Sequence, residues 1–177
     1  MTSGTELRRR GIARLAREGW TGGRSVWETD AEGREVAVDG VTVTEEPAPG
    51  DIARVLDLPA GAPVCVRSRR YLLDGGPVLL AVSRLPAELV RGTAVTRPDS
   101  GPGGIYARLA ELGVEPTRFR EEVRSRMPSR EESERLALGA GTPVMLVRRT
   151  ACTPEGRAVE VNDMDSAAYV LEYDFGA

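Results

Sequence analysis

The sequence predicts an α+β domain in which helices flank an antiparallel sheet. Residues 56–69 and 136–149 are two versions of one pattern, Leu-x-Leu-x-Ala-Gly-x-Pro-Val, which continues to an arginine at a constant offset of 80 residues. Each copy contains a helix end, a Gly/Pro turn, a β-branched strand, a tight turn and a second strand. A duplicated helix–hairpin unit implies one sheet with pseudo-twofold symmetry.

Composition restricts the class of protein. The 177 residues suffice for one domain with a real core, and the net charge of −3 argues against general affinity for nucleic acid. No apolar run approaches the ~20 residues of a membrane span, and no secretory leader is recognisable. Cys65 and Cys152 lie in apolar strands and are expected to be buried thiols of a cytoplasmic protein, with no membrane association.

Histidine is absent, which removes the commonest general base and the commonest metal ligand. No CxxC motif, Walker loop or dinucleotide fingerprint is present. Most familiar enzyme chemistries are therefore excluded or unfavourable, and we expect no metal and no cofactor.

The first third of the chain reads as a helix, a break, a strand pair and a second helix. Residues 5–18 have apolar positions at helical spacing with arginines exposed, either a solvated face or a nucleic-acid arm. A Gly-rich break over 21–24 precedes a strand–turn–strand over 25–43. Asp51 is expected to cap a short helix over 51–58.

The rest of the chain alternates hairpins with short helices. The expected elements are strands over 64–73 and 78–83, a one-turn helix over 85–90, a Gly/Pro loop over 99–104, a helix over 105–112, a strand over 117–127, a helix opened by a Ser129/Glu132 capping box, a hairpin over 144–152 and 158–162, and a last strand over 169–175.

Equivalent arginines on the two hairpins are candidate ligand-binding residues. Because side chains alternate along a strand, Arg69 and Tyr71 share one face, while Arg149 stands on a face otherwise built of apolar side chains. Burying an arginine is costly unless an anion pairs with it. That anion is either a carboxylate of the protein or an anionic ligand.

The repeat loses its symmetry after the tight turns, which differ by one residue. Leu79 then corresponds to Glu160, and Ala81 to Asn162. Glu160 and Asn162 therefore bring acceptors and donors to the side of the sheet that carries Arg69. In the alternative interpretation, Glu160 only pairs with an arginine of its own hairpin.

A glycine-rich loop adds a further candidate. Glycines at 101, 103 and 104 come directly before a helix, whose free N–H groups and dipole favour an anion. Tyr106, in the first turn of that helix, is expected to line the same cavity.

Several of these segments together resemble a known family. Residues 69–77, 85–90, 103–109, 141–144 and 159–161 resemble the UTRA domain, the effector-binding domain of the HutC subfamily of GntR-type bacterial transcription regulators. The resemblance implies a chorismate-lyase-like fold and a homodimer. It also implies a ligand pocket that uses Arg69, Tyr71, Gly104, Tyr106, Glu160 and Tyr169. Differences at Gly104, Tyr71 and Ala81 from relatives that bind phosphosugars favour a less polar metabolite.

The resemblance divides the chain at residue 20. Residues 1–20 are expected to be a linker-like helix without a complete winged helix-turn-helix, and residues 21–177 a UTRA-like domain. The expected function is effector sensing and dimerisation in a GntR/HutC-type regulator. The effector would be a small polar or anionic metabolite, and DNA would be bound only through a winged-helix domain absent from this chain. The alternative is a free-standing chorismate-lyase-like enzyme acting on a small carboxylate.

Overall fold

The computed structural model describes residues 6–10, 15, 31 and 33–173. Its order is β1 (Leu7–Arg10), β2 (Val36–Pro47), α2 (Gly50–Val55), β3 (Pro63–Leu73), β4 (Gly76–Pro86), α3 (Ala87–Val90), the 3-10 helix η3 (Ala94–Thr96), α4 (Gly104–Glu111), β5 (Arg118–Arg126), α5 (Arg130–Arg135), β6 (Val144–Cys152), β7 (Ala158–Ser166) and β8 (Tyr169–Glu172). The fold is α+β, as the sequence predicts. No helix among these residues has the length and apolar character needed to span a membrane.

A six-stranded antiparallel sheet forms the centre, in the order β2-β3-β4-β7-β6-β5. The two hairpins meet at the β4–β7 seam, so the strand order is symmetric about it. Arg69 pairs with Ala81 in the first hairpin, and Arg149 pairs with Asn162 in the second. The register therefore confirms the repeat, including the one-residue difference at the turns.

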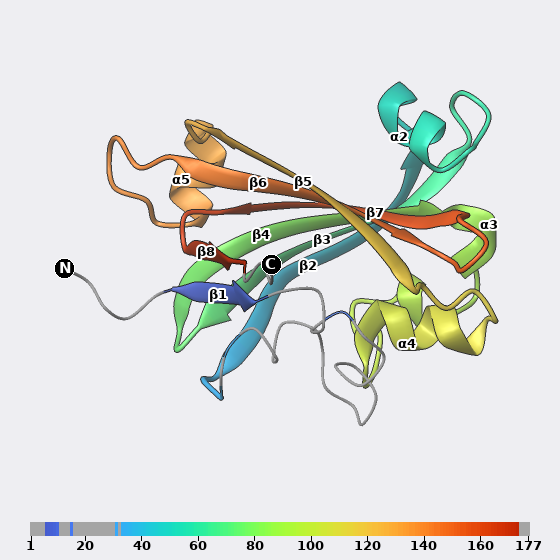
Figure 1. The fold of residues 1–177 in the computed structure, drawn as a ribbon, viewed down its shortest axis with the longest axis horizontal. Coiled ribbons are helices and arrows are strands. Elements are labelled where there is room, and N and C mark those ends of the chain that lie inside the picture. The colour runs from blue at the N-terminus through green and yellow to red at the C-terminus, as the bar shows by residue number, and fades with distance from the viewer. Residues whose placement is uncertain (1–5, 11–14, 16–30, 32, 174–177) are drawn as a thin grey trace, which may run out of the picture.

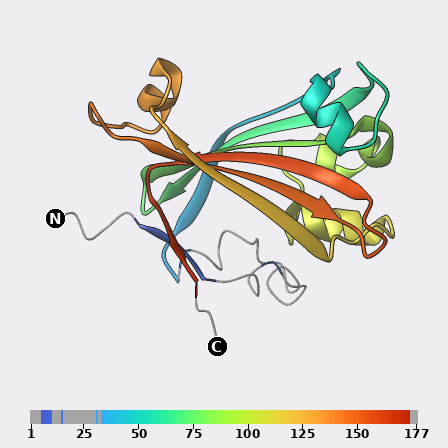
Figure 2. The ribbon, with the colours of Figure 1, turned by 45° about the horizontal axis from the view of Figure 1, so that its top comes forward.

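The two faces of the sheet are covered differently (Figures 1 and 2). Helices α2 and α5 lie on one face, and α4 lies on the other together with a small sheet in which β1 and β8 pair in parallel. On the α2 side, Ile52 and Val64 belong to one buried cluster, while Leu80 and Leu136 belong to another. Burial of these apolar faces is the main stabilising term of the fold.

The N-terminal segment differs from the sequence prediction. Leu7–Arg10 forms a strand, so the helix expected over 5–18 is wrong at these four residues. The parallel partner β8 supplies backbone acceptors, as when the Leu7 amide donates to the Ala168 carbonyl at 2.8 Å. Pairing with a segment distant in sequence thus overrides local helical spacing. The strand and turn expected from residue 25 lie mostly outside the described residues.

The two repeat helices begin differently. At α5, Ser129 and Glu132 form the predicted capping box. At α2 the cap position is Pro49, with no side-chain cap, so the prediction that Asp51 caps this helix is wrong. Asp51 lies in the first turn, where its carboxylate accepts a hydrogen bond from Arg148 of β6 at 2.8 Å. Strands β2, β4 and β7 are each longer than predicted.

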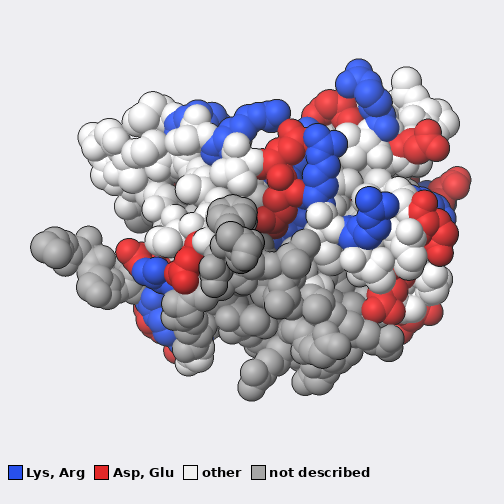
Figure 3. Space-filling view, viewed as in Figure 1, with Lys and Arg blue, Asp and Glu red and all other residues white. Residues whose placement is uncertain are grey.

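Charged side chains of both signs lie next to one another on the face shown in Figure 3, without a basic patch there. The alternating arginines and glutamates of β5 provide examples, such as Arg124, which pairs with Glu122 at 3.0 Å. This mixture agrees with the low net charge.

Candidate functional site

A cavity of about 550 Å³ lies between the sheet and the loop that leads into α4. It is on the face of the sheet that α4 covers. The lining residues come from β2, β3, the 98–104 loop, the first turn of α4, β6 and β7. The lining residues with polar side chains include Arg69, Tyr71, Tyr106, Arg149, Glu160 and Asn162.

Arg69 supplies a buried positive charge to this cavity. Its side chain donates to the Ser83 hydroxyl at 2.5 Å, and the residue is 7 % exposed. Its Nε atom has no hydrogen-bond partner, and no carboxylate of the described residues forms an ion pair with it. A guanidinium that hydrogen-bonds only to an alcohol and lies 6.0 Å from the centroid of the Tyr71 ring retains its capacity to bind an anion.

Arg149 has a different environment, because a carboxylate of the protein neutralises it. Its Nε donates to Glu121 Oε1 at 2.8 Å, and the residue is 1 % exposed. Burial by itself lowers the pKa of Arg149, but Tyr106 and Glu121 outweigh burial and raise the pKa above its ordinary value. Arg149 is therefore charged at every accessible pH.

Arg67 forms hydrogen bonds with the backbone of residues 95–98, which lead into the loop at the cavity. Its guanidinium donates to the carbonyl oxygens of Val95 and Arg97, and to that of Pro98 at 3.0 Å. Burial, followed by the neighbouring Arg69, lowers the pKa of Arg67. The sequence places Arg67 on the same face as Arg69 but gives no sign of this anchoring, because the acceptors are backbone atoms.

Strand β7, which pairs with β6 in the same sheet, presents hydrogen-bond acceptors beside these cations. Glu160 is 1 % exposed and its Oε2 has no partner, and Asn162 Oδ1 likewise has none. Burial, and then the charge of Glu160, raise the pKa of Tyr106, so its hydroxyl stays protonated and remains a donor. Buried polar atoms without partners are costly, and on a cavity wall a ligand can satisfy them.

The glycine loop gives α4 an uncapped start. Gly103 occupies the cap position at φ 77° without a side-chain cap, and Gly104 follows at φ 65°. Both angles are in the left-handed region, where only glycine is unstrained. The first-turn amides of α4 therefore lie at the cavity without a capping side chain, and this end of a helix favours anions.

Seven of the eight predicted ligand-binding residues line this cavity: Arg69, Tyr71, Gly104, Tyr106, Arg149, Glu160 and Asn162. Tyr169 is not among the lining residues. It lies in β8, with the Arg9 guanidinium 4.9 Å from its ring centroid. The reason is topological, because β8 leaves the main sheet to pair with β1.

Sequence analysis did not identify Glu121 or Ser83 as part of the site. Glu121 lies on β5 directly opposite Arg149, and Ser83 lies on β4 opposite Arg67. The alternating arginines and glutamates of β5 were the available signal for Glu121. No signal marked Ser83. Among the described residues, no cluster of three or more metal-ligating side chains is found.

The sequence matches the UTRA domain family over residues 31–164. An uncharacterized HTH-type transcriptional regulator of Streptomyces coelicolor is 32% identical over 179 residues, which cover 96% of this chain and 66% of the relative. The HTH-type transcriptional repressor PhnF of Mycolicibacterium smegmatis is 29% identical over 109 residues, covering 62% of this chain and 44% of PhnF. The chain thus spans less than two thirds of either relative.

Solved structures of regulators share the fold. A GntR-family transcriptional regulator superposes with a TM-score of 0.81 at 25% identity, covering 98% of this chain and 70% of the other. The effector domain of PhnF from Mycobacterium smegmatis gives a TM-score of 0.73 at 24% identity, and the match covers 83% of this chain and 91% of the PhnF domain. These comparisons identify regulators rather than enzymes.

Proposed function

The chain belongs to the UTRA domain family, a family of regulatory and not enzymatic domains, and on this premise we propose that its cavity binds a small anionic metabolite as effector. The observation that carries the proposal is Arg69, a buried guanidinium on the cavity wall that forms a hydrogen bond to an alcohol and no ion pair with a described carboxylate. Placing an anion there satisfies the guanidinium with a charge-assisted hydrogen bond.

The polar groups of the cavity define the chemical class of the effector. Its acidic group lies at Arg69 and the first turn of α4, where donors converge. It also carries a hydroxyl or an amine, since Glu160 Oε2 and Asn162 Oδ1 are buried acceptors without partners. Ala81, which pairs with Arg69 across the hairpin, adds no polar group. The effector is therefore an anion with a hydrogen-bond donor and a body less polar than a phosphosugar.

The regulatory context is part of the same proposal. The curated relatives are HTH-type regulators longer than this chain, which supports a DNA-binding partner domain. The domain works as a homodimer in the cytoplasm and reaches DNA through a winged-helix domain. Residues 1–20 act as the linker, and residues 21–177 as the effector domain. Effector binding then shifts the population of DNA-binding arrangements.

A binding screen tests the cavity assignment. Small carboxylates, phosphates and phosphonates with and without an amine or hydroxyl are titrated by calorimetry into wild type, Arg69→Gln and Arg70→Gln. Arg70 is the matched control, because it lies on the opposite face and pairs with Asp39 at 2.6 Å. We expect Arg69→Gln to weaken the best ligand about 30-fold or more and Arg70→Gln to leave affinity unchanged. Equal binding by all three proteins contradicts the assignment.

A further inference from the structure

The N-terminal strand is held against the cavity wall by a buried arginine. Arg9 of β1 is 2 % exposed, and its guanidinium donates to Glu121 Oε1 of β5 at 2.6 Å. On its other side the guanidinium lies over the Tyr169 ring of β8. Three elements distant in sequence therefore meet at one side chain.

The same carboxylate oxygen also accepts from the cavity. Glu121 Oε1 receives a hydrogen bond from Arg149 Nε at 2.8 Å, and Arg149 lines the cavity. Two guanidinium groups, both nearly fully buried, thus share a single oxygen of one carboxylate. Because both guanidiniums donate to the same oxygen in a low-dielectric environment, the two arginines compete for Glu121.

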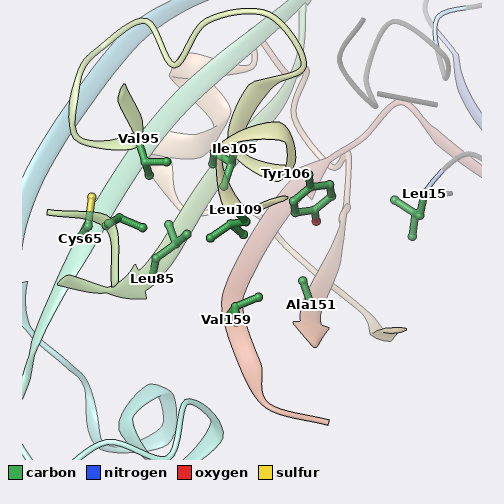
Figure 4. Packing of buried hydrophobic residues seen from close by; sticks show 10 residues of the cluster. Leu15, Cys65, Leu85, Val95, Ile105, Tyr106, Leu109, Ala151 and Val159 are labelled. Atoms are coloured by element: carbon green, nitrogen blue, oxygen red, sulfur yellow. The ribbon is translucent and has the colours of Figure 1, made fainter. Parts of the chain in front are cut away.

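Apolar contacts also connect the N-terminal segment with the residues around the cavity. Leu15 belongs to the buried cluster that contains Tyr106 and Ile105 of α4 (Figure 4). Leu7 of β1 belongs to the cluster that contains Tyr71. Two tyrosines that line the cavity therefore share hydrophobic clusters with residues from the N-terminal segment.

We propose that Glu121 is a positioning residue that couples occupancy of the cavity to the docking of strand β1, through the chain Arg149–Glu121–Arg9. The inference rests on the proposed function, because it assigns the regulation of that same site. In a full-length regulator, the segment that contains β1 is the one that leads toward a preceding DNA-binding domain.

The sign of the coupling follows from the shared oxygen. An anion bound at Arg69 also attracts Arg149, which lines the same cavity, and so leaves more of Glu121 Oε1 to Arg9 and holds β1 more firmly. By linkage, firm docking of β1 strengthens anion binding by the same factor. Without Glu121, Arg9 and Arg149 lose the carboxylate oxygen that they share, so β1 loosens and no longer responds to the anion.

Hydrogen exchange of the full chain, with inorganic phosphate as the probe anion, tests this coupling. Exchange of the Leu7–Arg10 amides is followed in wild type, Glu121→Gln and Arg148→Gln. Arg148 is the control, because it neighbours Arg149 on the same strand but pairs with Asp163 and Asp51 on the opposite face. Amides of the β4–β7 seam report whether each variant is folded.

We expect phosphate to slow exchange at residues 7–10 about fivefold in wild type and Arg148→Gln, the low end of usual couplings. In Glu121→Gln, exchange there is faster without phosphate and unaffected by it, while phosphate binds at least as tightly. As a second variant, Arg9→Gln stays folded and binds phosphate about fivefold more weakly, because Arg149 then no longer shares Glu121 Oε1 with Arg9.

The outcomes separate the two proposals. If phosphate binds in an Arg69-dependent manner and exchange at 7–10 does not respond, the coupling is overturned and the proposed function stands. If phosphate does not bind, the anion site is contradicted and the coupling, which rests on it, is overturned as well. Equal exchange at residues 7–10 in Glu121→Gln and Arg148→Gln, with phosphate bound, overturns the coupling alone.

Discussion

The two hairpins carry an arginine at the same place and use it differently. In the second copy, β5 pairs with β6 without a break, which places Glu121 opposite Arg149. In the first copy, the β2–β3 register shifts between Asp39 and Thr42, and no described carboxylate forms an ion pair with Arg69. In the second half, Arg149 pairs with a carboxylate of the protein. In the first half, the equivalent Arg69 remains available to an anionic ligand.

The two central strands, β4 and β7, differ in the opposite direction, because here the second copy carries the groups available to a ligand. The second copy has Glu160 and Asn162 where the first has Leu79 and Ala81, so the free acceptors come from one half and the free cation from the other. Neither half contains a complete binding site. Divergence between the two copies at these positions therefore combines a free cation and free acceptors in one cavity.

Replacing Leu79 by glutamate, the residue at the equivalent position of the second copy, is expected to have the largest effect on the free energy of unfolding. Leu79 is 0 % exposed in an apolar cluster, so Leu79→Glu buries a carboxylate without a partner. We expect the free energy of unfolding to fall by about 4 kcal/mol in urea titrations. Leu79→Met is the control and should cost less than about 1.5 kcal/mol. A stable Leu79→Glu protein would show that the first half tolerates the polar pattern of the second.

Replacing each of the paired arginines by leucine tests the contrast between them directly. Arg149→Leu removes a counterion from Glu121, which keeps Arg9, and we expect a loss of about 3 kcal/mol in the free energy of unfolding. Arg69→Leu removes a buried charge that hydrogen-bonds to the Ser83 hydroxyl and has no carboxylate partner among the described residues, so we expect a change of less than about 1 kcal/mol. Urea titrations at pH 7 measure both. Equal losses would indicate that Arg69 also serves stability.

The repeat helices provide a pH-dependent contrast. Arg126, together with the Ser129 amide, lowers the pKa of Glu132 to about 2, whereas α2 has no capping box. Because the folded pKa lies below the unfolded one, the contribution is present above about pH 4.5 and is lost as pH falls toward 2. We expect about 2 kcal/mol, since partial exposure screens the interaction. In Glu132→Gln this part of the stability–pH curve flattens, whereas Glu131→Gln retains it.

Removing the cap is expected to have the smallest effect. The Ser129 hydroxyl accepts from the Glu132 amide at 3.2 Å, so Ser129→Ala leaves that amide without its cap. We expect a loss of about 1 kcal/mol in thermal unfolding. Pro49→Ala at α2 is the matched change and removes no capping side chain. A similar loss at both positions would mean that the hydroxyl does not stabilise α5.

Much of the fold was predictable because its signals are local. Gly/Pro turns, β-branched strands and the capping box each depend on a few neighbouring residues, and the constant offset aligned the two copies. The strand at Leu7–Arg10 was not predictable in this way, since its partner β8 is at the other end of the chain. Asp51 failed as a cap because its carboxylate has a stronger partner in Arg148.

The site was predictable where it depends on strand alternation. Arg69 and Glu160 lie where alternation and the repeat place them, both on the cavity wall. The placement of Tyr169 rested on resemblance alone, and the chain leaves the sheet before that residue. Partner choice was beyond the sequence, because nothing local shows that Arg149 has a carboxylate from β5 while Arg69 has none.

The symmetric strand order has a consequence for how the chain folds. Strands β3 and β4 pair across a short turn, as do β6 and β7, so each hairpin closes a small loop. The β4–β7 seam joins residues about 80 positions apart through five pairs, such as Ser83 with Asn162. Loop-closure entropy makes this seam the late and costly step. We therefore expect two preformed halves to dock, with the effector cavity absent until they meet.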